Sequence, residues 1–134
     1  MSNSTVSGPF RSENGFQQLV NGVWTPIELV TRVVSTASAS SLTPNISVAD
    51  MYAYTALAAN LTINVPIGSY SDGSRLMFRI LDNGVSRTLT WNGIYTAIGV
   101  TLPGSTTASK TTYVGCIYNS ANNRWDVIAV TTEA

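Results

Sequence analysis

The chain has 134 residues and no net charge at neutral pH, and only 10% of its residues are charged against 44% that are hydrophobic. Its seven cations are scattered and form no basic stripe, so nucleic-acid binding is not expected. The chain also lacks a run of about 18 apolar residues, so a membrane-spanning helix is not expected. A charged share far below the usual value of about 25% predicts that much surface is buried against other copies or partners. A charge-poor secreted β-sandwich is the alternative.

The first part of the chain is predicted to be an anchoring segment. Residues 1 to about 15 are polar and contain Gly8-Pro9 and Asn14-Gly15, which is typical of an extended arm. Asn21-Gly22 lies between two short apolar runs and predicts a hairpin. Isolated aromatic residues in such an arm either bind a partner or pack onto the arm's own domain. The side chains that we expect at a partner interface are Phe10, Phe16, Leu19, Val23 and Trp24.

The boundary with the following domain is expected near residue 41. Residues 28–36 form a β-branched run of strand type, and residues 37–41 form a low-complexity joint. We therefore expect an arm and hairpin over 1–41 and a β-sandwich over 42–134. Residues 49–59 are ambiguous, because their alanines favour a short helix and their tyrosines favour a strand. Residues 61–65 alternate as a strand.

The stretch from Asp72 to Trp91 contains two strand-like runs around Asp82-Asn83-Gly84, which predicts a β-hairpin. Asn92-Gly93 predicts another tight turn, leading into residues 94–98. Residues 111–118 and 124–130 form a final pair of strands, and the second has apolar residues at nearly every position. That pattern predicts burial on both faces, by a second sheet and by a neighbouring chain.

Short strands at this spacing predict an all-β fold, namely an antiparallel β-sandwich or jelly-roll-like head with an extended N-terminal arm. Two loops of that head offer aromatic and amide side chains that suit sugar binding, although packing is the preferred explanation for the aromatic residues. The loop residues in question are Tyr70, Asp72, Asn119 and Asn122.

The sequence contains no catalytic pattern. Histidine is absent, and none of the seven carboxylates lies in a metal-ligand motif. Asp72 and Asp82 stand beside turn glycines, where aspartate usually shapes the turn. The single cysteine, Cys116, lies in an apolar run and is expected in the core. We expect a non-enzymatic protein without a cofactor.

Residues 44–130 resemble a β-domain that recurs in virion proteins of tailed bacteriophages, both in tail-fibre tips and in capsid decoration proteins. The resemblance covers about two thirds of the chain. Its motifs are Pro44-Asn45, Asp50, Ala56-Leu57-Ala58, Pro66-Ile67-Gly68, Asp72-Gly73, Leu76, Phe78-Arg79-Ile80, Asp82-Asn83-Gly84, residues 87–92, residues 99–103, Lys110, residues 113–119 and Trp125-Asp126-Val127.

This resemblance implies a non-enzymatic, trimeric β-sandwich exposed on a virus particle. A fibre would normally carry a long repetitive shaft before this domain, whereas here an N-terminal segment of about 40 residues without internal repeats precedes it. This difference favours a capsid decoration or cement protein over a fibre. Its partners would be further copies of itself and the major capsid protein, at the capsid surface. The alternative is a tail-fibre or receptor-binding tip that recognises a host-surface glycan. Neither membrane nor nucleic acid is an expected partner.

Overall fold

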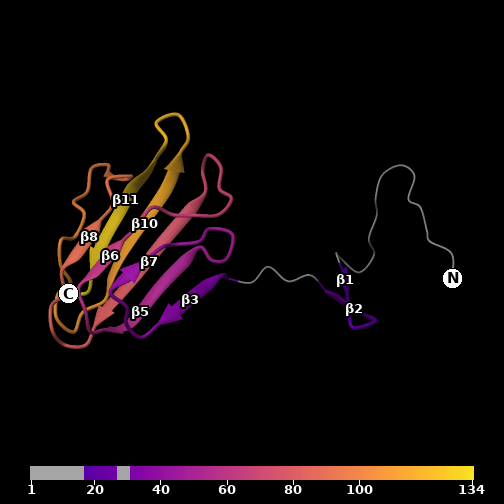
Figure 1. The fold of residues 1–134 in the computed structure, drawn as a ribbon, viewed down its shortest axis with the longest axis horizontal. Coiled ribbons are helices and arrows are strands. Elements are labelled where there is room, and N and C mark those ends of the chain that lie inside the picture. Colours follow the sequence, from indigo (N-terminus) through magenta and orange to yellow (C-terminus); the bar gives the residue numbers. More distant parts are fainter. Residues whose placement is uncertain (1–16, 27–30) are drawn as a thin grey trace. The chain divides into compact units, whose positions relative to one another are not determined.

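The computed structural model describes residues 17–26 and 31–134 (Figure 1). The chain divides into two units, residues 1–30 and residues 31–134. In the first unit, β1 (Gln17–Val20) and β2 (Val23–Pro26) pair antiparallel. Asn21 and Gly22 between them have φ angles of 49° and 79°, as a tight hairpin turn requires. The hairpin predicted at this dipeptide is confirmed.

The second unit is built from strands. In chain order they are β3 (Val33–Thr36), β4 (Ser41–Leu42), β5 (Met51–Leu57), β6 (Leu61–Ile63), β7 (Arg75–Asp82), β8 (Leu89–Trp91), β9 (Tyr95–Ala97), β10 (Thr112–Asn119) and β11 (Arg124–Thr132). No helix forms in residues 31–134, so the all-β prediction is confirmed. The domain begins ten residues before the boundary expected near residue 41, because β3 already pairs with β5.

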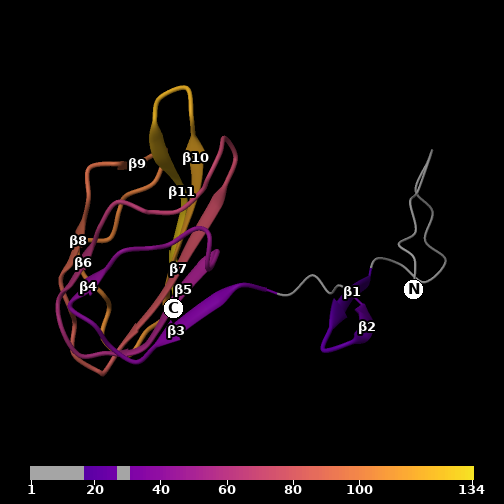
Figure 2. The same cartoon turned by 45° about the vertical axis from the view of Figure 1, so that its right-hand side comes forward.

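The strands form two layers that face each other (Figure 2). One sheet has the order β3-β5-β7-β10-β11-β9, and the other has the order β4-β6-β8. In the larger sheet, β7, β10 and β11 pair antiparallel, whereas β3 with β5, β5 with β7, and β9 with β11 are parallel. The smaller sheet is entirely parallel. The prediction of an antiparallel architecture is therefore wrong in strand direction.

The parallel pairings follow from the path of the chain. From β3 to β9 successive strands alternate between the larger and the smaller sheet. A chain that leaves one sheet for the other and then returns enters the first sheet again in the same direction, so strands two apart in sequence become parallel neighbours. The smaller sheet therefore consists only of parallel pairs.

The hairpin predicted around Asp82-Asn83-Gly84 does not form. β7 pairs with β5 and β10, while β8 pairs with β6 in the other layer. A tight turn is present, because Asp82 Oδ1 accepts a hydrogen bond from the Gly84 amide, but the chain then crosses to the second sheet. Asn92-Gly93 likewise carries the chain between layers, from β8 to β9.

The ambiguous segment at 49–59 is the strand β5, with ladder partners on both sides. Its neighbours thus override the helix preference of its alanines. Tyr52 and Tyr54 point into the core with exposures of 6% and 4%. The strand expected over 61–65 is shorter than predicted, at Leu61–Ile63.

The core lies between the layers. Phe78 of β7 is fully buried, and its ring meets those of Trp91 and Tyr95 edge-on, with centroids 5.2 and 5.9 Å away. Trp91 Nε1 donates a hydrogen bond to the Pro103 carbonyl (2.8 Å), so this indole packs without an unpaired donor. Such edge-to-face contacts add about 0.5–1.5 kcal/mol each beyond the burial of area. Cys116 is buried in β10, as expected.

Candidate binding surfaces

The two loops predicted as a binding surface lie side by side at one end of the domain. Asp72 Oδ1 accepts a hydrogen bond from the Ser120 amide (2.9 Å). The Gly73 amide donates to the Tyr118 carbonyl (2.9 Å), and the Tyr118 amide donates to the Ser74 carbonyl (2.8 Å). The described hydrogen bond of the Asp72 side chain thus joins the two loops, whereas the sequence predicts one within its own turn.

Tyr70 packs into the domain. Its ring centroid lies 4.7 Å from that of Tyr118 and 5.2 Å from that of Trp125, which is fully buried. Both tyrosine rings are half-buried. This geometry favours the packing role for Tyr70 that the sequence left open, with only part of its ring exposed to a ligand. Trp125 Nε1 is buried and has no hydrogen-bond partner.

The asparagines of the second loop differ in role. Asn119 Nδ2 donates to Asp126 Oδ2 (3.0 Å), and Asn119 Oδ1 accepts from the Asn122 amide (3.2 Å). Arg124 Nε donates to Asp126 Oδ1 (2.7 Å). The hydrogen bond from Asn119, together with Arg124, holds the pKa of the Asp126 carboxyl below its usual value although partial burial opposes this. The Asn122 side chain is exposed.

The predicted arm residues are described in part. In the β1–β2 hairpin, Leu19 is 60% exposed and Val23 is 63% exposed. Trp24 lies in β2 opposite Leu19, but its side chain lies outside the described residues. Phe10 and Phe16 lie outside them entirely.

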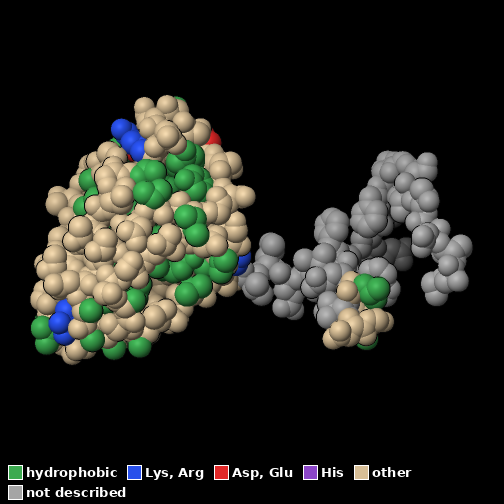
Figure 3. Space-filling view, viewed as in Figure 1, with side chains coloured by type: hydrophobic (Ala, Val, Ile, Leu, Met, Phe, Trp, Pro, Cys, Tyr) green, Lys and Arg blue, Asp and Glu red, His purple; other side chains and the backbone are tan. Residues whose placement is uncertain are grey.

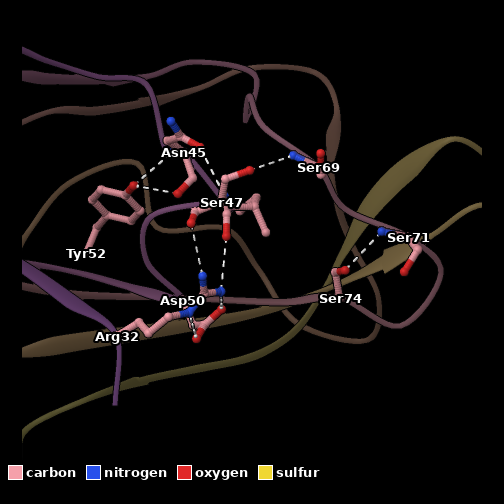
Figure 4. A network of polar contacts seen from close by, with 9 residues as sticks. Arg32, Asn45, Ser47, Asp50, Tyr52, Ser69, Ser71 and Ser74 are labelled. Carbon is pink, nitrogen blue, oxygen red and sulfur yellow. Dashed lines mark hydrogen bonds and ion pairs between the residues drawn. The ribbon is translucent and has the colours of Figure 1, made fainter. Parts of the chain in front are cut away.

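A polar network that the sequence analysis missed fixes the start of the second unit (Figure 4). Arg32 forms a two-point ion pair with Asp50 and also donates to the carbonyls of Ile46 and Ser47. The hydrogen bond from Arg32 lowers the pKa of the Asp50 carboxyl. Spacing alone does not reveal this pair, because its members are 18 residues apart and meet only where β3 and β5 lie side by side in the larger sheet.

Gly68 completes this network. Its φ angle is +92°, and a Cβ atom there would lie 2.5 Å from Asn45 Oδ1 and 2.9 Å from the Ser47 amide nitrogen. Asn45 Oδ1 in turn accepts a hydrogen bond from the Ser47 amide (3.0 Å). Only glycine fits this close approach.

The outer face of the larger sheet carries exposed apolar side chains at its centre. A depression of about 340 Å³ on it is lined by Met51, Met77, Gly115, Ile117, Ile128 and Ala129, with Asp50 and Arg75 at its rim. Met77 is 40% exposed and Ile128 is 55% exposed. The predicted burial of the last strand is confirmed on the inner face, by Trp125 and Val127, and burial of its outer face by a neighbouring chain stays a prediction. Charged side chains are also few on the face seen in Figure 3.

Ala129 joins Ile128 on this outer face because of a β-bulge. The β10–β11 register shifts between Gly115 and Cys116, so that Gly115 lies opposite Ala129 while Cys116 lies opposite Val127. The extra residue of the bulge is Ile128, and both it and Ala129 line the depression. Gly115 leaves the floor of the depression without a side chain.

Within the described residues, no group of three or more His, Cys, Asp or Glu side chains is placed to hold a metal ion. The described residues contain no helix that is long and apolar enough to cross a membrane. Burial raises the pKa of the Cys116 thiol to about 12, so this cysteine is protonated at neutral pH.

No protein-family model matches the chain, and no curated protein matches it. Among solved structures, a chain from a structure of a chaperone–substrate complex aligns with 82% of this chain at 13% sequence identity and a TM-score of 0.46. The present chain spans 18% of that chain. A similarity this low does not bear on function.

Proposed function

We propose that this protein is a non-enzymatic structural protein of a tailed-phage virion, which decorates the capsid and binds the major capsid lattice. The observation that carries the proposal is a β1–β2 hairpin, in a unit separate from the main domain, that exposes 60% of Leu19. The sequence resemblance to phage decoration domains and the charge-poor composition support it.

An isolated two-stranded hairpin is at best marginally stable in water. A partner surface that buries Leu19 stabilises the hairpin, since complete burial of a leucine side chain contributes about 1.5–3 kcal/mol. In this proposal Phe10, Phe16, Val23 and Trp24 belong to the same interface. The capsid lattice provides the partner surface, and the location is the outside of the capsid.

The two-layer domain is the head in this proposal, a sandwich whose loops remain available on the particle. Self-association belongs to the proposal as well, and the phage resemblance implies a homotrimer. No catalytic step and no cofactor are assigned to the head.

Copy number tests the location. Quantitative mass spectrometry of purified virions should find hundreds of copies per particle. A few copies, or about a dozen, would instead place the protein in the tail.

Binding to capsids that lack the protein tests the arm. The double variant Leu19→Asp/Val23→Asp should fail to coat them, because it places two carboxylates in the proposed apolar contact. Val85→Asp is the matched control, since Val85 is 55% exposed in the other unit. Full coating by the double variant would contradict the proposed role of the arm.

A receptor-binding tip that recognises host glycan is the second candidate, favoured by the joining of the loops at 69–74 and 119–123 around Tyr70. It predicts that purified protein adsorbs to host cells and that Asn122→Ala together with Tyr70→Ala reduces adsorption. Absence of adsorption at micromolar concentration would count against this candidate.

A further inference from the structure

The outer face of the larger sheet has an internal symmetry across β7, β10 and β11. The residues of β7 that point away from the core include Arg75, Met77 and Arg79, because Leu76, Phe78 and Ile80 are buried inside. By the same alternation, β10 presents Tyr113, Gly115 and Ile117 outward. These outward residues stand in rows with those of β11.

Three rows cross the central strand β10. Ile117 lies between Arg75 and Asp126, Gly115 lies between Met77 and Ala129, and Tyr113 lies between Arg79 and Thr131. Each row thus has its β10 residue in the middle and one residue on either side, at about 5 Å from strand to strand.

The charges at the ends of the first row are opposite and do not meet within one chain. Two strand spacings, about 10 Å, separate the backbones of Arg75 and Asp126. Arg75 forms no ion pair in the described residues, where the ion pairs are Arg32 with Asp50 and Arg124 with Asp126. Asp126 accepts one hydrogen bond at each oxygen, so each oxygen keeps a further acceptor position.

We propose that this face binds the same face of a second copy of the chain, about a two-fold axis that runs along β10. Such an axis exchanges β7 and β11. It places Arg75 of each copy against Asp126 of the other, and Met77 of each copy against Ala129 and Ile128 of the other. Tyr113, Gly115 and Ile117 lie on the axis and meet their own copies.

The surface suits this contact. A two-fold interface must be self-complementary, and here one face supplies both members of the charge pair and both sides of the apolar contact. Gly115, at the middle of the face, carries no side chain to keep the sheets apart. Met and Arg are enriched at protein interfaces, and here Met51, Met77 and Arg75 line an apolar depression of about 340 Å³. The exposed Met77 and Ile128 become buried in the dimer.

This inference does not depend on the proposed capsid function. The homotrimer implied by the phage resemblance would need a different contact, because a three-fold arrangement does not place one face against itself. Sedimentation equilibrium of the full chain is expected to give a dimer, or an even-numbered assembly built from such dimers. A monomer or a lone trimer would overturn the proposal.

A mixing experiment tests the pairing itself. Arg75→Asp alone places two aspartates against each other at both ends, and Asp126→Arg alone places two arginines there. Each variant should dissociate at least about tenfold more readily than the wild type, because like charges replace opposite ones. An equimolar mixture should associate again, since each heterodimer regains two opposite pairs. Absence of recovery, with both variants folded, would contradict the pairing.

Two further variants keep the proposal testable if Asp126→Arg unfolds. Met77→Lys should weaken association, whereas Val85→Lys, which alters an exposed apolar residue outside this face, should not. Tyr113→Cys should give dimers with a short bis-maleimide crosslinker, because Tyr113 meets its own copy on the axis. The wild type is the control, as its one cysteine, Cys116, is buried. Equal crosslinking of both proteins would contradict the two-fold geometry.

Discussion

Replacing Asp82 by alanine tests the turn that sends the chain from one sheet to the other. The Asp82 side chain is 4% exposed. Its Oδ1 accepts hydrogen bonds from the amides of Gly84 (3.0 Å) and Ser109 (2.8 Å), and its Oδ2 accepts one from the Thr106 hydroxyl (2.6 Å). This carboxylate thus ties the turn after β7 to the loop at 106–109.

The expected loss follows from these three bonds. A hydrogen bond to a charged group contributes about 1.5–3 kcal/mol, but water replaces part of this where the amides lie near the surface. We therefore expect Asp82→Ala to lower the free energy of unfolding by about 3 kcal/mol. Asp72→Ala is the matched control. Asp72 is exposed and accepts a single hydrogen bond, from Ser120, so its loss should be under about 1 kcal/mol.

Urea unfolding followed by tryptophan fluorescence measures both variants. Equal urea midpoints for Asp82→Ala and Asp72→Ala would refute the role assigned to Asp82. Acid titration adds a second test. Burial raises the pKa of the Asp82 carboxyl, but the hydrogen bonds from Thr106, Ser109 and Gly84 together lower it by more than burial raises it. The pKa of Asp82 therefore lies below the usual value.

A depressed pKa in the folded state stabilises the protein above the unfolded pKa of about 3.9, and this contribution is lost as the pH falls through the folded pKa. The stability difference between wild type and Asp82→Asn should therefore be constant above about pH 5 and shrink below about pH 4. A difference that grows on acidification would contradict the hydrogen-bond pattern.

Three further predictions concern the core and the polar network. Gly68→Ala should lower the free energy of unfolding, measured by chemical denaturation, by about 2 kcal/mol or more, because its φ is +92° and an added Cβ would lie 2.5 Å from Asn45 Oδ1. Gly93→Ala is the control: an added Cβ there meets open space, so the change should stay within about 0.5 kcal/mol. Phe78→Ala should cost about 3–5 kcal/mol by the same measurement, and a loss under about 1 kcal/mol would contradict its central place in the core. Cys116 should react with Ellman's reagent at pH 8 far more slowly in the native protein than in urea, since burial raises its thiol pKa to about 12; equal rates would place it at the surface.

The sequence predicts the turns of this fold better than its strand partners. Asn21-Gly22 joins a true hairpin, and residues 119–123 join β10 and β11 as expected. Asp82-Asn83-Gly84 also turns, but the strand that follows pairs elsewhere. A turn motif fixes the local backbone, whereas the partner of β8 is set by packing across the core against residues far away in sequence.

The candidate surfaces show the same division. The loops of Asp72 and Asn119 could be named from their residue types, and they do lie together. The apolar outer face was foreseen only as a second buried side of the last strand. Its depression depends on the bulge that turns Ala129 to the same face as Ile128, and no residue pattern marks that shift in register.

The alternation of strands between layers also bears on how the chain folds during synthesis. Within residues 31–134, β10 and β11 are the one pair of consecutive strands that form a ladder, and they fill the larger sheet between β7 and β9. Long-range parallel pairing is slow, and the sheet stays incomplete until β11 has been made. Ribosomes stalled before residue 124 should therefore hold a chain that protease cleaves readily, and protection should begin only after Val127 has left the exit tunnel.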